Sequence, residues 1–113
     1  MLKSYEMKNN IYRTANVFFR DELAGVISET ATGYSFVYSD DFLRSKRSIS
    51  VSLPISKRIF ESPKLFPFFV GLLPEGWFLN IVCLTLKIDK NDLFGLLLAT
   101  GDDTVGAVSV RSL

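Results

Sequence analysis

The chain has 113 residues, of which 48% are hydrophobic and 13% are aromatic, and its formal net charge is +1. This length suits a single domain spanning residues 1–113, and the apolar content excludes a disordered chain. Because 13 basic residues nearly balance 12 acidic ones, no general field favours nucleic acid or an anionic membrane. We therefore expect no direct nucleic-acid partner and no membrane partner.

The cysteine content and the start of the chain indicate the compartment. Cys83 is the single cysteine, which excludes an intramolecular disulfide and suits a reducing environment. The start of the chain lacks the pattern of a secretory signal, and no segment reaches the ~20 apolar residues that a membrane helix needs. We expect a cytoplasmic protein.

The first half of the chain has the pattern of β-strands. Apolar runs at 15–19 and 23–27 flank a charged turn at 20–22, which is typical of a β-hairpin. After a second turn at 30–33, Tyr34, Phe36 and Tyr38 alternate with smaller residues, as in a half-buried strand. The three strands predict an antiparallel meander.

A short helical turn and a further strand are expected next. Asp40 and Asp41 can cap the turn, since their carboxylates accept hydrogen bonds from free backbone N–H groups. In "SISVSLP", Ile49, Val51 and Leu53 alternate with serines before a proline, so we expect a strand here.

From residue 63 the periodicity becomes helical. Pro67 suits the first turn of a helix that runs to about residue 72, Pro74 suits the first turn of the next, and Glu75 favours the positive end of that helix dipole. Two apolar stripes run along the second helix, so we expect it to be buried on both sides. The stripes are Trp77, Ile81, Leu84 and Ile88 on one side and Phe78, Val82 and Leu86 on the other.

A third helix and a last strand complete the expected fold. Asp89 is the expected N-cap of the helix, Gly101 its left-handed stop, and Gly95 inside it indicates close packing. The segment 106–111 then predicts a strand that returns to the sheet. The fold class is therefore α+β: a small antiparallel sheet of about five strands, a meander plus a C-terminal strand, packed with about three helices.

The residue types leave little room for catalysis. The chain has no histidine, which removes the commonest general base and metal ligand, and it has no phosphate-binding glycine loop. Asp102 and Asp103 could in principle hold Mg²⁺, but adjacent aspartates in a turn beside glycine are more often turn formers. We expect no catalytic residue, no cofactor and no metal, and hence a binding module.

One stretch of the chain is locally basic. The only charged residues between Phe42 and Phe60 are positive, which is typical of a solvated surface and also suits a docking patch for an acidic partner. They are Arg44, Lys46, Arg47, Lys57 and Arg58.

Three motifs follow one another along the chain: "SISVSLP", "PFFVGLLPEGW" and "DLFGLLLATGDDTVGAVSV". In this order and spacing they resemble the N-terminal subdomain of HipA-type serine/threonine kinase toxins, over residues 11–110. The matching residues are Ser52-Leu53-Pro54, Phe68-Phe69, Leu72 to Gly76, Leu97-Leu98, Gly101, Asp103 and Gly106-Ala107.

The resemblance implies a role without catalysis. In HipA-like proteins the kinase core lies beyond this subdomain, so none of its catalytic residues can be carried over. A free-standing version of the subdomain is similar to HipS, the small component of HipBST toxin–antitoxin modules. The resemblance thus implies an antitoxin that binds a HipT-like serine/threonine kinase in trans, in a ternary complex with a HipB-like helix-turn-helix protein.

Trp77 is the first candidate for contact with the kinase. It is the single tryptophan and follows the bend at Pro74, Glu75 and Gly76, and tryptophans often anchor protein interfaces. We expect these four residues to bind the kinase, with Trp77 in or beside its active site. The alternatives are that Trp77 belongs to the core with its stripe and that Glu75 only favours the helix dipole.

Two rival functions stay open at this point. The chain could be an accessory subunit that completes a split kinase and supports its activity. It could also be a scaffold that bridges the kinase and the HipB-like protein without affecting catalysis.

Overall fold

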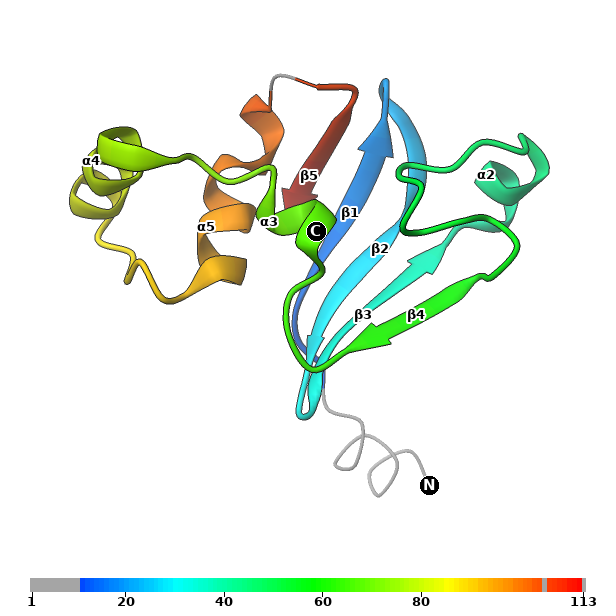
Figure 1. Cartoon of the computed structure of the whole chain (residues 1–113), viewed down its shortest axis with the longest axis horizontal. Coiled ribbons are helices and arrows are strands. Elements are labelled where there is room, and N and C mark those ends of the chain that lie inside the picture. The colour runs from blue at the N-terminus through cyan, green and yellow to red at the C-terminus, as the bar shows by residue number, and fades with distance from the viewer. Residues whose placement is uncertain (1–10, 105, 113) are drawn as a thin grey trace.

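The computed structural model describes residues 11–104 and 106–112, and for residues 11, 12, 77 and 103 it describes the backbone alone. A five-stranded sheet in the order β4-β3-β2-β1-β5 forms the centre of the molecule, and every pairing is antiparallel (Figure 1). Its strands are β1 (Ile11–Phe19), β2 (Glu22–Thr30), β3 (Gly33–Tyr38), β4 (Ile59–Ser62) and β5 (Val108–Ser112). The expected meander and the returning C-terminal strand are confirmed.

The two hairpins are set by their turns. Arg20 and Asp21 connect β1 to β2 with positive φ angles of 50° and 68°, which match the twist of the paired strands. Gly33 begins β3 at φ 149°, and a Cβ there would lie 2.2 Å from the carbonyl oxygen of Ser62. Only glycine therefore allows β4 to pair with β3 at this corner.

The strand expected in "SISVSLP" is wrong. Ile49 and Leu53 are buried, Val51 at the tip is 97% exposed, and the backbone turns back where the N–H of Leu53 donates to the carbonyl oxygen of Ser50. The Tyr38 hydroxyl accepts a hydrogen bond from the N–H of Ile49, at 3.1 Å, and donates one to the carbonyl oxygen of Leu53. The alternation thus marks the two anchors of a clamped loop, and the strand beside β3 is the later segment β4.

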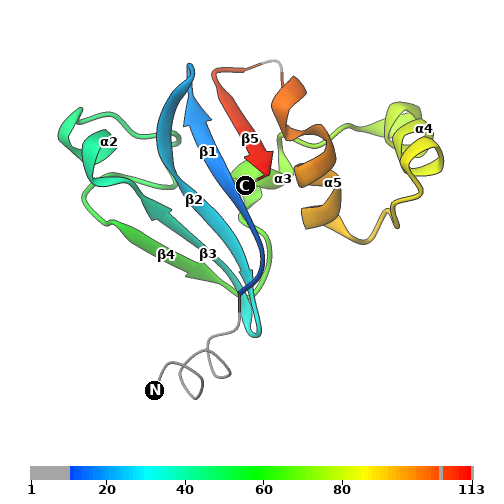
Figure 2. The same ribbon diagram turned by 180° about the vertical axis from the view of Figure 1, so that it is seen from behind.

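The described part of the chain has four α-helices and one short 3₁₀ helix. They are α2 (Asp40–Arg44), α3 (Pro67–Val70), α4 (Gly76–Leu86), α5 (Leu93–Thr100) and η1 (Gly101–Asp103). In Figure 1, α3 lies in front of the sheet at β5 and β1, and α5 lies beside the edge strand β5; none of the described helices crosses the strands β1 to β4 on the face turned forward in Figure 2.

The caps of these helices differ from expectation. Ser39, and not Asp40 or Asp41, caps α2, since its side chain accepts from the N–H of Phe42. Asp92, in place of Asp89, caps α5 by accepting from the N–H of Gly95. In each case a neighbouring polar residue occupies the position where its oxygen reaches a free N–H.

Three expected helix ends also need correction. Gly101 has φ −67° and is not a left-handed stop; a Cβ there would lie 2.7 Å from the Cβ of Val110, so it is a glycine of close approach. Pro67 occupies the first turn of α3 as expected, although α3 ends at Val70. Pro74 precedes α4, which begins at Gly76.

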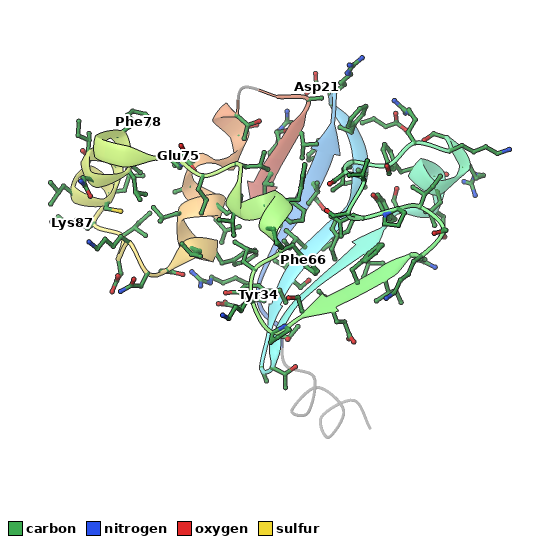
Figure 3. All side chains as sticks on the ribbon, viewed as in Figure 1. Asp21, Tyr34, Phe66, Glu75, Phe78 and Lys87 are labelled. Atoms are coloured by element: carbon green, nitrogen blue, oxygen red, sulfur yellow. The ribbon has the colours of Figure 1, made fainter. Side chains whose placement is uncertain are left out.

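Aromatic rings fill the core between the sheet and its helices. Phe36 is fully buried, and its ring centroid lies 4.8 Å from that of Tyr38 and 5.7 Å from that of Phe69 in α3. Phe66 and Leu65 are buried beside them, and Figure 3 marks Phe66 where the chain enters α3. Phe66 and Phe69 of "FPFFVGLLPEGW" therefore belong to the core, whereas Val70 is exposed.

Arg13 joins the sheet to α5. Its guanidinium donates from Nε to Glu29 Oε1 and from Nη2 to Asp92 Oδ1, both at 2.8 Å, and lies 5.5 Å from the ring centroid of Phe94. A Cβ on Gly95 would lie 2.2 Å from Asp92 Oδ2, so the expected close packing of Gly95 is confirmed. The hydrogen bonds from Arg13 lower the pKa of Asp92.

Candidate partner-binding site

Helix α4 exposes an unusual amount of apolar surface. Leu84 is 80% exposed, Phe78 55%, Leu86 49% and Ile81 44%, and none of the described side chains of α4 is buried. The helix lies apart from the sheet at one end of the molecule (Figure 1). Our expectation that α4 is buried on both sides is therefore wrong for the isolated chain.

The connection to α4 gives the helix its direction. Gly76 has φ +60°, and no atom lies within 4 Å of a Cβ built there, so its conformation and not crowding requires glycine. Glu75 is the N-cap, exposed and without a side-chain hydrogen bond to the helix. Figure 3 marks Glu75 at the entry to α4 and Phe78 on the helix, both away from the sheet.

The side chain of Trp77 lies outside the described residues, so its predicted exposure stays a prediction. The backbone of Trp77 belongs to α4, and residues four and seven positions later, Ile81 and Leu84, share its side of the helix by spacing. Both of these neighbours are exposed. The stripe to which this position belongs is therefore a surface stripe.

A groove runs between α4 and the end of α5. It has a volume of about 640 Å³ and is lined by residues of the α3–α4 connection, of α4, of α5 and of the segment after it. Its lining residues are Gly71, Leu72, Leu73, Pro74, Phe78, Ile81, Val82, Thr85, Leu86, Ala99, Thr100, Thr104 and Gly106. Pro74, expected at the partner site, thus lines this groove.

The described lining of the groove is apolar and carries no charge. Of its three threonines, Thr100 donates its hydroxyl to the carbonyl oxygen of Leu96, and Thr104 donates to that of Val108. This lining has no acid, base, thiol or phenol that could act as a general acid or a nucleophile. The arrangement suits the binding of apolar surface and offers no group for chemistry.

The predicted basic docking patch lies near α2, at the opposite end of the molecule from α4 (Figure 1). Its three arginines pair with carboxylates: Arg44 with Asp41, Arg58 with Asp40, and Arg47 with Glu22. The Arg47 guanidinium also lies over the rings of Phe19 and Phe42, and the Lys57 ammonium over that of Phe60. Much of the positive charge of the patch is thus balanced within the fold.

Perturbed titratable groups belong to the sheet side of the molecule. Burial raises the pKa of the Tyr34 and Tyr38 phenols. The carboxylates of Asp102 and Asp21 raise the pKa of Arg111. No group of three or more potential metal ligands occurs among the described residues, and no described helix has both the length and the apolar character for crossing a bilayer.

Sequence reasoning missed the groove and the exposure of Leu84. The groove forms only where residues of α4 and α5 come together in the fold, so no local sequence pattern predicts it. One signal was available in the sequence. A helix that is apolar on both sides needs two covering surfaces, and a chain of this size has few elements that could supply both, so exposure of one side was to be expected.

Fold and site together define a small α+β domain that exposes an apolar helix. The family model of the HipA N-terminal domain matches residues 15–111, and the chain belongs to this family. The solved structure of the N-terminal domain of HipA toxin superposes with a TM-score of 0.71 at 33% identity, covering 90% of this chain and 93% of that one.

Two relatives show the range of contexts of this domain. An uncharacterized protein of Haemophilus influenzae is 35% identical over 102 residues, which are 90% of this chain and 94% of that protein. The serine/threonine-protein kinase toxin HipA of Shewanella oneidensis is 31% identical over 98 residues, which are 85% of this chain and 22% of that protein. The chain matches the N-terminal domain of such toxins and not their kinase catalytic domain.

Proposed function

We propose that this chain is a non-catalytic antitoxin of the HipS type, which binds a HipA-like serine/threonine kinase toxin in trans in the cytoplasm and neutralises it. The observation that carries the proposal is the exposure of α4, an apolar helix with no buried described side chain. The matching domain in Shewanella oneidensis makes up 22% of a kinase toxin. An apolar surface of this kind is typical of a helix that a partner covers.

Residues Pro74 to Trp77 begin this surface. A protein bound at a kinase cleft inhibits by filling the space that substrate or nucleotide must enter, or by holding the lobes in an inactive arrangement. In the proposal Trp77 enters or borders the active site, with Ile81 and Leu84 continuing the contact along α4. Glu75, which is exposed at the helix start, pairs in this proposal with a basic residue of the kinase.

The proposal includes a ternary complex with a HipB-like helix-turn-helix protein. The basic patch near α2 would serve that second contact, because it lies at the opposite end of the molecule from α4 and leaves α4 to the kinase (Figure 1). Lys46 is exposed, and the paired arginines of the patch also keep part of their surface in solvent, so an acidic partner could reach them.

Co-expression with the cognate kinase tests the function. We expect the wild-type chain to restore growth and Trp77→Ala to leave the cells poisoned, because truncating an interface anchor costs about 2 kcal/mol or more. Val51→Ala is the matched control, since Val51 is 97% exposed in the loop that Tyr38 of β3 holds and does not line the groove beside α4. Protection by Trp77→Ala equal to that by wild type would remove Trp77 from the mechanism.

A phosphorylation assay separates the antitoxin from an activating subunit. The accessory-subunit alternative is favoured by the Shewanella oneidensis relative, in which the domain is part of the kinase chain itself. We expect substrate phosphorylation by the purified kinase to fall when this chain is added. A rise would establish the activating role instead, and an unchanged rate with stable binding would leave a scaffold.

A further inference from the structure

The groove beside α4 is a second apolar surface, which adjoins the outer stripe of the same helix at Ile81 and extends away from Leu84. From α4 the groove takes Phe78, Ile81, Val82, Thr85 and Leu86, so Ile81 borders both surfaces, whereas Leu84 does not line the groove and lies on the other side of the helix by spacing. A partner that covers the outer stripe alone would leave the groove open to water.

The chemistry of the groove restricts its occupant. Two of the three threonine hydroxyls in the described lining are committed to backbone carbonyl oxygens, and no charged side chain is part of that lining. Sites for small polar molecules combine apolar walls with a few converging polar groups, and this groove does not offer them. An occupant must therefore be apolar and uncharged over the buried part.

The size of the groove suits part of a protein chain. Its volume of about 640 Å³ is within the range of about 300 to 1,000 Å³ typical of clefts that bury a whole ligand. A single side chain would leave most of it empty, while several neighbouring side chains on one helix or loop would fill it.

The relatives indicate where such a segment comes from. The matched domain is 22% of the Shewanella oneidensis kinase toxin, so in that protein a much longer chain is at hand to cover the surface that is open here. We propose that the groove receives an uncharged, apolar segment of the kinase, so that α4 is enclosed on both sides in the complex. This inference rests on the proposed function, because it requires that the chain binds the kinase.

The two-sided enclosure accounts for the composition of α4. An isolated helix of 11 residues is marginal in water, and most helix stability in proteins comes from packing. α4 is apolar on both sides, yet none of its described side chains is buried in the free chain. With the kinase on both sides of α4, the apolar side chains on both sides of the helix are buried.

Charge placed in the groove tests the inference. Ala99 on α5 and Thr85 on α4 are both exposed and both line the groove, and neither belongs to the stripe of Trp77. We expect Ala99→Glu and Thr85→Glu each to weaken binding to the purified kinase at least about tenfold in calorimetry, since a buried carboxylate would have no partner. Ala31→Glu is the matched control, because Ala31 is exposed in the β2–β3 turn and does not line the groove.

The outcomes separate the inference from the function beneath it. Wild-type binding with unchanged affinity of both groove variants would overturn the inference and leave the antitoxin proposal standing. Failure of the wild-type chain to bind the kinase would overturn both. A dimer of the free chain in sedimentation velocity, abolished by Ala99→Glu, would assign the groove to a second copy and also overturn the inference. Circular dichroism checks that each variant is folded. If Ala99→Glu does not fold, Thr85→Glu alone tests the groove.

Discussion

Most of the described large apolar side chains of the sheet and its loops are buried or half-buried, whereas the helix α4 exposes most of its own. On the sheet side, rings, ion pairs and the Tyr38 hydroxyl hold residues that are far apart in the sequence, and Phe36, Tyr38 and Phe42 are almost wholly buried. α4 is also mostly apolar, yet none of its described side chains is buried. The difference teaches that hydrophobic residues of the sheet side maintain the fold, whereas most of those of α4 are exposed and contribute little to it.

The largest expected effect comes from removing a ring of the core. Phe36→Ala should lower the free energy of unfolding by about 3–5 kcal/mol, since it leaves a cavity among the rings of Tyr38, Phe60 and Phe69. For a domain whose total stability is of the order of 5–15 kcal/mol, this change is severe. Urea unfolding followed by circular dichroism measures it, and a loss below about 1 kcal/mol would contradict the picture of a well-packed sheet side.

A smaller effect is expected from the clamp on the loop at 49–53. Tyr38→Phe removes the hydroxyl that accepts from the Ile49 N–H and donates to the Leu53 carbonyl oxygen. Because two buried backbone groups lose their partner, we expect a loss of about 1–3 kcal/mol. Hydrogen exchange of the Ile49 amide reports the clamp directly, and protection as strong as in wild type would mean that the loop does not depend on Tyr38.

The ion pair between the sheet and α5 should have a modest, pH-dependent effect. The hydrogen bonds from Arg13 hold the pKa of Asp92 below its ordinary value of 3.8, so the stabilisation is present above that value and is lost as the pH falls through the lower pKa of the folded state. Both side chains are more than a third exposed, so solvent limits the contribution to about 1 kcal/mol or less.

Asp92→Asn isolates this contribution. Asparagine is an equally good N-cap, so the variant removes the charge and keeps an acceptor for the Gly95 N–H. We expect it to be less stable than wild type in urea unfolding at pH 6 and to approach wild type at pH 2. A stability difference of constant size from pH 6 to pH 2 would show that the ion pair is not its source.

The smallest effect on stability is expected at α4. This prediction is the most direct test of the difference between the buried sheet side and the exposed helix. Leu84→Glu should change the free energy of unfolding by no more than about 0.5 kcal/mol, because the side chain is 80% exposed and glutamate is a good helix former. Its effect should instead fall on kinase binding, measured by calorimetry on the same preparation. If Leu84→Glu unfolded the domain, α4 would belong to the core and the division into two regions would be wrong.

Local patterns predicted the regular elements well wherever the residues that satisfy the backbone are near in sequence. The hairpin around Arg20 and Asp21 was predictable from two apolar runs and a charged turn. The loop at 49–53 was not, because the hydroxyl that satisfies its backbone comes from Tyr38, outside the segment. β4 was not predicted, because a strand of four residues is too short for an alternating pattern to be recognised.

The candidate site divides in the same way. Its starting residues, Pro74 to Trp77, were predicted from the single tryptophan and the breakers before it, and they still carry the proposed contact. The buried or exposed state of the stripe that follows could not be read from periodicity, since an apolar stripe looks the same whether the sheet or a partner covers it.

By itself, the sequence determined the class of the fold, the meander and the returning C-terminal strand, because these depend on residue type and on neighbours a few positions away. Only the tertiary structure decided which apolar residues are core. Among the described elements, α3 covers part of one face of the sheet, and α5 lies beside the edge strand β5 (Figure 1). α4 lies farther from the sheet than these two helices, the described part of the chain does not enclose it, and the groove between α4 and α5 is open.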